Sequence, residues 1–283
     1  MSSSLSPEQV AEYTLEVGVK KANNSFIRSF SLAVMGGMFI ALAAIGSLIA
    51  TSTIDNFSVS ALVGGLVFST GLVMVVIAGG DLFTGNVLII LSVLQKRTHA
   101  AKMVRNLAAA FLGNLVGAMG IVFMVQYSGL LTSGSGAVLK KLILKASHKL
   151  EYPFYQAFLL GVLCNLMVCT AVWMMYSAKD TAGKVLACIF PITVFVLSGY
   201  EHIVANMYYI PAGILAASNS EYVRLAGLSA DSIANLTFGD IGINFVPVFL
   251  GNLVGGLIIG TLYNTIYLRS NTKTVINKLE KSA

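Results

Sequence analysis

Long stretches without a single Asp, Glu, Lys or Arg residue are the feature that most limits what this chain can fold into. A helix needs about 20 mainly apolar residues to cross a hydrocarbon core of about 30 Å. Four uncharged stretches are long enough for one crossing each: residues 29–54, 106–139, 152–178 and 241–268. This pattern predicts an all-α membrane protein.

Two further apolar regions are each interrupted by one acid. Asp81 divides residues 56–95, and Glu201 divides residues 185–220. Each region is too long for one straight helix and short for two complete crossings. A pair of interrupted apolar segments in matching places indicates broken helices. We therefore expect six transmembrane helices, of which the second and fifth are broken.

Loop charges support this count and give an orientation. With six spans and both termini cytoplasmic, the 18 Lys and Arg residues divide 13 inside to 5 outside. If each interrupted region were two full spans, the division would be 11 to 7, which fits the positive-inside rule less well. We expect a multi-pass protein of the cell (plasma or inner) membrane, with a cytoplasmic N-terminal helix over residues 1–28, a transmembrane domain over 29–270 and a cytoplasmic tail over 271–283.

Composition excludes several classes of protein. Only 11% of the residues are charged, whereas soluble domains carry about 25%. The net charge of +6 is too scattered for a nucleic-acid surface. The three cysteines lie in apolar runs without CxxC spacing, and no HExxH motif or Ser/His/Asp set is visible. We expect no metal, no cofactor and no enzymatic activity.

The N-terminal segment carries a helix signal. Ser6 and Gln9 have the spacing of a capping box, and Pro7 suits the first helical position. Val10 and Val17 follow, with Tyr13 between them, at helical spacing. We expect a short amphipathic helix on the inner membrane surface, in contact with lipid. A loosely ordered terminus is the alternative.

The chain contains an internal repeat. The sequence Phe-Leu-Gly-Asn-Leu-Val-Gly at residues 111–117 recurs without a gap at residues 249–255. The copies fall in the third and sixth spans, and each interruption runs from its acid to an asparagine five positions later. Three spans per half place the halves in opposite orientations, which predicts an inverted 3+3 repeat whose broken helices meet near the midplane. Helix packing alone would also explain the two copies.

The two interruptions favour a binding site for an anion or a polar solute. The N-terminus of a half-helix presents free N–H groups and a positive dipole end. We expect Asp81 and Glu201 to cap these N–H groups, with proton handling as the alternative role. We expect Asn86 and Asn206 to hold the loops in shape.

His202 is the one histidine at predicted membrane depth, where ionisable groups are costly and usually functional. Thr84 lies near the matching point of the other interruption, so the two side chains could hold a small anion together. A buried, hydrogen-bonded core histidine and a helix-capping threonine are the alternative. Lys140, Lys141, Lys145 and Lys149 lie on the predicted outer side, where they would either concentrate anions or form a solvated helix.

Several motifs resemble those of the formate/nitrite transporter family. They are Gly80–Thr84 at the first interruption, Asn165–Cys169 in the fourth span and Gly199–Met207 at the second interruption, together with His148-Lys149, the two repeat copies and the closing residues 266–269. The resemblance covers roughly residues 10–270.

The resemblance implies an aquaporin-like protomer, a homopentamer with one pore per protomer, and passage of a small monovalent anion, with or without a proton. It implies that Thr84 and His202 form the central pair, that Glu201 and Asn165 lie near the histidine, and that Lys149 lies in the outer vestibule. It also implies two constrictions, with Leu72 and Phe195 on the inner side and Phe68, Leu82, Phe83 and Val168 on the outer side.

Formate, nitrite and hydrosulfide are the candidate substrates; we expect formate first. A neutral-solute pore of the aquaporin type shares the inverted architecture, although the Asn-Pro-Ala signatures of that class are missing. The substrate could cross either as an anion stabilised by His202 or, with a proton, as the neutral weak acid.

Overall fold

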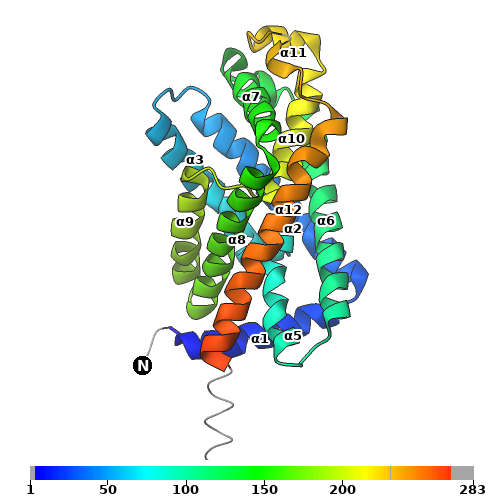
Figure 1. The fold of residues 1–283 in the computed structure, drawn as a ribbon. Helices are drawn as coiled ribbons and strands as arrows, with labels where there is room; N and C mark the ends of the chain where they lie inside the picture. The colour runs from blue at the N-terminus through cyan, green and yellow to red at the C-terminus, as the bar shows by residue number, and fades with distance from the viewer. Residues whose placement is uncertain (1–3, 230, 269–283) are drawn as a thin grey trace, which may run out of the picture.

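The computed structural model describes residues 4–229 and 231–268, and within these ranges the chain forms helices and no strand (Figure 1). The longer helices are α1 (Pro7–Asn23), α2 (Phe26–Thr51), α3 (Phe57–Met74), α6 (Ala100–Tyr127), α7 (Ala137–Glu151), α8 (Phe154–Ser177), α9 (Thr181–Leu197), α10 (Ile203–Ala217) and α12 (Ile241–Tyr263). The shorter ones are α4 (Phe83–Asn86), α5 (Ile90–Leu94) and α11 (Ser220–Leu225). Single turns of 3-10 or π-helix join or extend them: η1 (Val75–Gly79), η2 (Val87–Ile89), η3 (Leu130–Thr132), η4 (Gly134–Gly136), η5 (Asp231–Ile233), η6 (Phe238–Asp240) and η7 (Asn264–Leu268).

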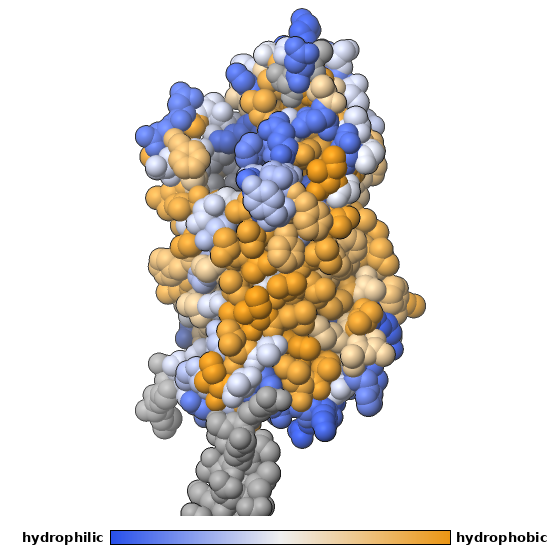
Figure 2. All heavy atoms as spheres, viewed as in Figure 1, coloured by the Kyte–Doolittle hydropathy of each residue, from blue (hydrophilic) through white to orange (hydrophobic). Residues whose placement is uncertain are grey.

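The chain is a multi-pass membrane protein. Five helical segments within the described ranges are long and apolar enough to cross a bilayer: Phe26–Thr51, Phe57–Gly79, Ala100–Tyr127, Phe154–Ser177 and Phe238–Leu268. Figure 2 shows an apolar band around the middle of the visible face, with hydrophilic residues at both ends. The α9 and α10 helices are apolar but individually short. The count of six crossings, with α9 and α10 as the fifth, stays a prediction.

The two halves are built in the same way. In the first half α2 packs along α6, and in the second α8 packs along α12. The repeat glycines make this approach possible, because a Cβ on Gly113 would meet the carbonyl oxygen of Phe30, and one on Gly251 would meet that of Phe158. Small residues at matching positions therefore bring equivalent helices into close contact.

Both expected helix breaks are present. In the first half, α3 and η1 end at Gly79, residues 80–82 are not helical, and α4 begins at Phe83. In the second half, α9 ends at Leu197 and α10 begins at Ile203. Gly79 and Gly199, each two residues before the acid of its break, have positive φ angles of 91° and 71°. This left-handed conformation strains residues with a side chain, which explains glycine at both places.

The α1 helix lies across one end of the bundle, and the expected capping box between Ser6 and Gln9 is present (Figure 1). Its expected apolar face is only partly right, because Val10 is buried but Tyr13 is 44% exposed. The buried face includes the small residues Gly18 and Ala22, since α1 rests against protein, contacting α5, α6 and α8. The expected tail over 271–283 lies outside the described residues, as does Arg269.

Candidate functional site

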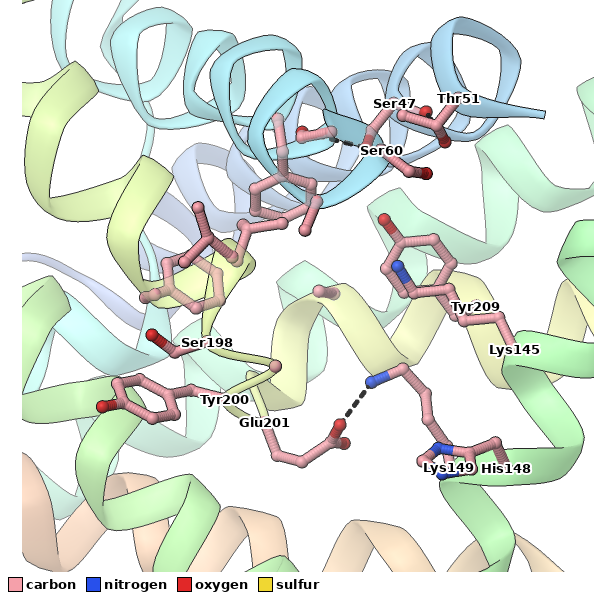
Figure 3. Close-up of a pocket in the computed structure, with 18 of the residues that line it drawn as sticks. Ser47, Thr51, Ser60, Lys145, His148, Lys149, Ser198, Tyr200, Glu201 and Tyr209 are labelled. Carbon is pink, nitrogen blue, oxygen red and sulfur yellow. Dashed lines mark hydrogen bonds and ion pairs between the residues drawn. The ribbon is translucent and has the colours of Figure 1, made fainter. Parts of the chain in front are cut away.

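Two cavities approach the breaks from opposite ends of the molecule. The larger, here called the α7 chamber, has a volume of about 630 Å³ and is lined by residues of α7, α3 and the second break (Figure 3). The smaller, here called the α1 cavity, has a volume of about 210 Å³ and is lined by Lys21 of α1, by the first break and by α8. The two cavities share no lining residue.

Thr84 and His202 meet between these cavities. Thr84 is the second residue of α4, and His202 directly precedes α10, so each lies at the N-terminal end of a half-helix. Thr84 Oγ1 and His202 Nε2 are 3.0 Å apart, and both residues are buried. His202 lines the α7 chamber, while Leu82 and Gly85, on either side of Thr84, line the α1 cavity. The sequence predicted this pair, and the fold joins two residues 118 positions apart.

The hydrogen bonds of His202 define its tautomer. The backbone N–H of Ala205 donates to His202 Nδ1 at 3.2 Å, which requires an unprotonated Nδ1. A neutral ring then carries its hydrogen on Nε2, and this Nε2–H donates to Thr84 Oγ1. Protonation of Nδ1 would break the bond that caps α10, so this arrangement favours the neutral ring. The hydroxyl hydrogen of Thr84 remains available to another acceptor.

Asn165 of α8 contacts the threonine and not the histidine. Its Nδ2 donates to the carbonyl oxygens of Thr84 and Asn252, at 3.3 and 2.5 Å. The side chain of Glu201 also points away from the histidine, toward α7. Asn165 therefore holds the backbone of Thr84, and Glu201, the residue before His202, connects the central pair to a charged network.

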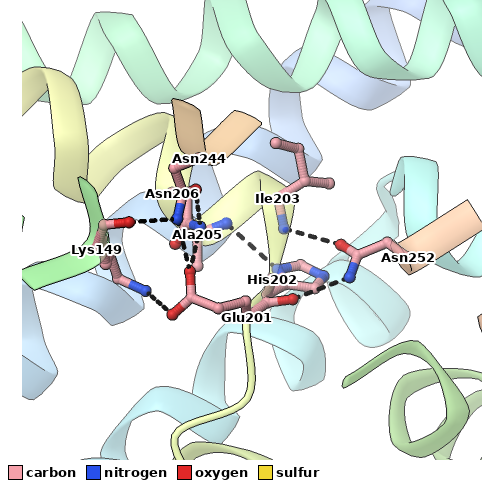
Figure 4. A network of polar contacts seen from close by, with 8 residues as sticks. All are labelled: Lys149, Glu201, His202, Ile203, Ala205, Asn206, Asn244 and Asn252. Carbon is pink, nitrogen blue, oxygen red and sulfur yellow. Dashed lines mark hydrogen bonds and ion pairs between the residues drawn. The ribbon is translucent and has the colours of Figure 1, made fainter. Parts of the chain in front are cut away.

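The charged network joins α7 to the second break (Figure 4). Lys149 Nζ lies 2.6 Å from Glu201 Oε1, and both side chains are buried. Glu201 Oε2 accepts from Asn206 Nδ2 at 2.7 Å and from Asn244 Nδ2 at 3.2 Å. Asn244 Nδ2 also donates to the carbonyl oxygen of Lys149 at 2.8 Å. The buried carboxylate therefore has a cation and two amide donors, which is the condition for keeping a charge there.

The first break carries a matching network. Lys21 Nζ lies 2.7 Å from Asp81 Oδ1 and donates to Asn86 Oδ1 at 2.7 Å. Asn106 accepts from Asn86 Nδ2 and donates to the carbonyl oxygen of Lys21. Burial lowers the pKa of Lys21, but the Asp81 carboxylate and Tyr176 together raise it by more, so this pKa lies above its usual value. Since α1 precedes the first half as α7 precedes the second, the repeat includes these two helices.

The asparagines of the repeat copies hold the half-helices. Asn114 Oδ1 accepts from the N–H of Phe83, and Asn252 Oδ1 accepts from that of Ile203, both at 2.9 Å. Asn114 Nδ2 donates to the carbonyl oxygen of Asp81, and Asn252 Nδ2 donates to that of Glu201.

The expectation that the acids Asp81 and Glu201 cap these helices was therefore wrong. Their carboxylates turn toward the lysines, and neutral amides take the helix N–H groups. The Asn86 and Asn206 side chains link their breaks to neighbouring asparagines, as expected of residues that hold a loop in shape.

The apolar residues group differently from the expectation. Phe195 lies beside Phe68, with ring centroids 5.7 Å apart, and both line the α7 chamber. Leu72, Leu82 and Val168 line the α1 cavity. Leu72 and Phe68 are one turn apart on the same face of α3, yet they line different cavities.

Phe83 lines neither cavity. Its ring stacks on Phe249 and meets Phe111 edge-on in the core between α6 and α12. The expected grouping of the two constrictions was wrong, and the Phe83 ring packs in the core instead of lining either of the two cavities.

The basic side chains of α7 divide into two faces. Lys141, Lys145 and Lys149 recur every four residues and line the α7 chamber, whereas Lys140 is exposed. Burial lowers the pKa of Lys145 to about 7, and the charge of Lys149 adds to this effect. Burial also lowers the pKa of Lys141. The sequence left open whether these lysines face a cavity or solvent; three of them face the cavity.

Sequence reasoning missed Lys21, Asn106 and Asn244, and it did not assign the bonds that Asn114 and Asn252 make. A signal was available for Asn106 and Asn244, because each lies eight residues before the asparagine of a repeat copy. Extending the repeat by those eight residues would have paired them. Lys21 has no such signal, since α1 and α7 share no matching motif.

Comparisons with known proteins decide the family. The family model described as formate/nitrite transporter matches residues 8–266. The chain belongs to the formate/nitrite transporter family. Among curated relatives, the formate channel FocA of Escherichia coli K12 is 37% identical over 273 residues, covering 94% of this chain and 96% of the relative. FocA of Haemophilus influenzae is 38% identical over 262 residues, covering 91% and 92%.

Solved structures of the family share this fold. A pentameric formate channel with formate bound matches with a TM-score of 0.77 at 36% identity, covering 86% of this chain and 98% of that one. An ion channel of the same family matches with a TM-score of 0.74 at 28% identity, covering 89% and 96%. The described fold is therefore that of a transport protein of this family.

Proposed function

We propose that the chain is a channel for a small monovalent weak-acid anion, with formate as the first candidate, and that it works as a homopentamer with one pore per protomer. The observation that carries this proposal is the buried Thr84–His202 pair, which lies at the N-terminal ends of two half-helices between two cavities. The names of the formate channel relatives, one of them pentameric with formate bound, support the substrate and the assembly.

The polar groups at the pair suit a small acceptor. With Nε2–H directed to Thr84 Oγ1, the threonine hydroxyl can donate to a carboxylate oxygen. The dipole ends of α4 and α10 add positive potential at the same point. A solute there exchanges part of its hydration for these donors, while Phe68 and Phe195 exclude bulk water on the chamber side.

The neutral His202 ring affects whether the substrate crosses as an anion or as the neutral acid. An unpaired carboxylate in an apolar slit is costly, and desolvation favours its protonated form. A neutral histidine supplies no positive charge to offset it. The substrate therefore takes up a proton as it leaves water and crosses as the neutral acid, and protons move with it.

The same proposal includes an orientation. We place α1 and both termini on the cytoplasmic side and the α7 chamber outside, since the loop charges favour this arrangement. Lys149 and Lys21 then lie near the outer and inner openings, where each attracts anions while paired with an acid. Lipid surrounds the apolar band.

Flux from proteoliposomes tests the function. Formate, nitrite and hydrosulfide are compared at two pH values and two imposed voltages, with chloride as control. A pH gradient should drive formate uptake, and voltage alone should have little effect. Intact water or glycerol permeation without flux of any of the three anions would favour the neutral-solute pore instead.

A further inference from the structure

The α7 chamber contains one lysine, Lys145, that has no hydrogen-bond or ion-pair partner among the residues that the structure describes. Lys141 Nζ donates to the Thr51 carbonyl oxygen at 2.6 Å and to Ser60 Oγ at 2.8 Å. Lys149 is paired with Glu201. Lys145, between them on the same face, makes no hydrogen bond or ion pair with any side chain that the structure describes. Its Nζ lies over the ring of Tyr209, 4.4 Å from the centroid.

The surroundings of Lys145 favour capture of an anion. The side chain is half-buried, so water solvates the ammonium incompletely. Lys149 Nζ lies 5.7 Å from the same Tyr209 ring, so a second positive charge is near. Figure 3 shows the Lys145 ammonium group beside this ring and the Lys149 ammonium group directed toward Glu201. An anion bound there would relieve this repulsion and supply the missing partner.

Other charged and titratable groups face the chamber from each surrounding segment. They are Lys141, His148 and Lys149 of α7, Asp55 between α2 and α3, Tyr152 before α8, Tyr200 and Glu201 of the second break, and Tyr209 of α10. Glu201 is already paired with Lys149, and no contact joins Asp55 to Lys145. The three lysines exceed the two acids by one positive charge; Lys141 has two neutral oxygen acceptors, whereas Lys145 has none.

The size of the chamber indicates how an anion would be held. A water molecule occupies about 30 Å³ in the liquid, so a chamber of about 630 Å³ admits a small anion together with several waters. The ion would keep part of its hydration at Lys145. It would lose the rest only when it passes Phe68 and Phe195 toward the central pair.

We propose that Lys145 forms a second anion-binding station, which holds a small monovalent carboxylate over Tyr209 before it moves on to the Thr84–His202 pair. This rests on the proposed function, because the ligand is the transported ion. The station is separate from the Lys149–Glu201 pair, and its effect is on uptake from the α7 side at low concentration. Replacement of Lys145 should leave the maximal rate nearly unchanged, since the central pair is untouched.

Amine labelling tests binding without relying on transport. The reconstituted protein is treated with the membrane-impermeant reagent trinitrobenzenesulfonate, and modification of each lysine is followed by mass spectrometry. Formate should slow the labelling of Lys145 several-fold relative to chloride at equal ionic strength, while labelling of the exposed Lys140 should not change. Equal labelling of Lys145 in formate and chloride would overturn the proposal.

Kinetics separate failure of the station from failure of the function. In vesicles sorted so that the α7 side faces outward, Lys145→Met should raise the formate concentration for half-maximal uptake by roughly threefold to tenfold, as expected from losing one partly screened charge-assisted bond. Lys145→Arg should restore it, and Lys140→Met serves as the matched control. Wild-type flux with an unchanged Lys145→Met curve would refute the station alone. Absence of wild-type formate flux would refute the proposed function.

Discussion

Replacing Asn252 by alanine removes the side chain of α12 that bonds the backbone at the second break. Three polar groups lose a partner: the Ile203 N–H and the carbonyl oxygens of Gly161 and Glu201. Gly161 is inside α8, so its carbonyl keeps its helical hydrogen bond. The Ile203 N–H is at the first residue of α10 and the Glu201 carbonyl lies in the non-helical break, so neither has such a substitute. Two buried backbone groups are therefore left without a partner.

The loss in free energy of unfolding follows from those two backbone groups. A buried polar group left unsatisfied costs about 1–3 kcal/mol, so Asn252→Ala should lower the free energy of unfolding by about 2–6 kcal/mol. Asn114→Ala should do the same within about 1 kcal/mol, because Asn114 makes equivalent bonds at the first break and the same two kinds of group are orphaned. Asn56→Ala is the matched control, since Asn56 is an exposed N-cap whose loss costs about 1 kcal/mol.

Titration with SDS in mixed micelles measures these free energies, and formate flux measures the consequence for the break. Both interior variants should be clearly less stable than Asn56→Ala and should transport poorly. If Asn114→Ala and Asn252→Ala were no less stable than the control, the reasoning that these amides hold the half-helices would be refuted.

Three further outcomes follow from the charged groups. Lys149→Met leaves the Glu201 carboxylate buried without a cation and should destabilise the protein by about 3–5 kcal/mol. The double variant Lys149→Met/Glu201→Gln should recover most of that loss in the same titration. Equal stability of the single and double variants would contradict the pairing. His202→Phe removes the ring nitrogens that bond Thr84 Oγ1 and the N–H of Ala205, so formate flux should fall strongly at every pH; wild-type flux in this variant would remove His202 from the site. The pKa of Lys145 is lowered by burial to about 7, so its ammonium form is mostly present at pH 6 and mostly lost at pH 8. Half-maximal uptake from the α7 side should therefore require up to about tenfold more formate at pH 8 than at pH 6, and Lys145→Arg, which stays charged, should remove this part of the difference.

The charge-free runs were sufficient to predict the long apolar helices and the two breaks. A bilayer requires long apolar segments, and a single acid inside one of them, near glycines, has few structural explanations. The same logic located His202, because an ionisable ring at membrane depth is rare. The pairing with Thr84 followed from the inverted repeat, which places the two breaks at the same depth.

Side-chain direction was harder to predict. Asp81 and Glu201 have the residue type of helix caps, yet their carboxylates face lysines of helices that precede each half. That contact depends on how α1 and α7 fold back over the bundle, which no local pattern encodes. Asn114 and Asn252 were read as part of a packing motif, because an asparagine in an apolar run does not reveal which backbone groups it will reach.

The grouping of the apolar constrictions failed for a related reason. Phe68 and Leu72 are neighbours on one helix face, and only the position of the central pair decides which cavity each one lines. Phe83 illustrates the same limit, since its ring packs against Phe111 and Phe249, which lie on helices distant in the sequence.

In the proposed mechanism, a weak acid crosses at the Thr84–His202 pair together with a proton. Its most direct test is uptake of radiolabelled formate by proteoliposomes, with a pH gradient and a membrane potential imposed separately. Uptake should follow the pH gradient, change little with voltage and exceed chloride uptake by a wide margin. Uptake that follows voltage and ignores the pH gradient would contradict this mechanism.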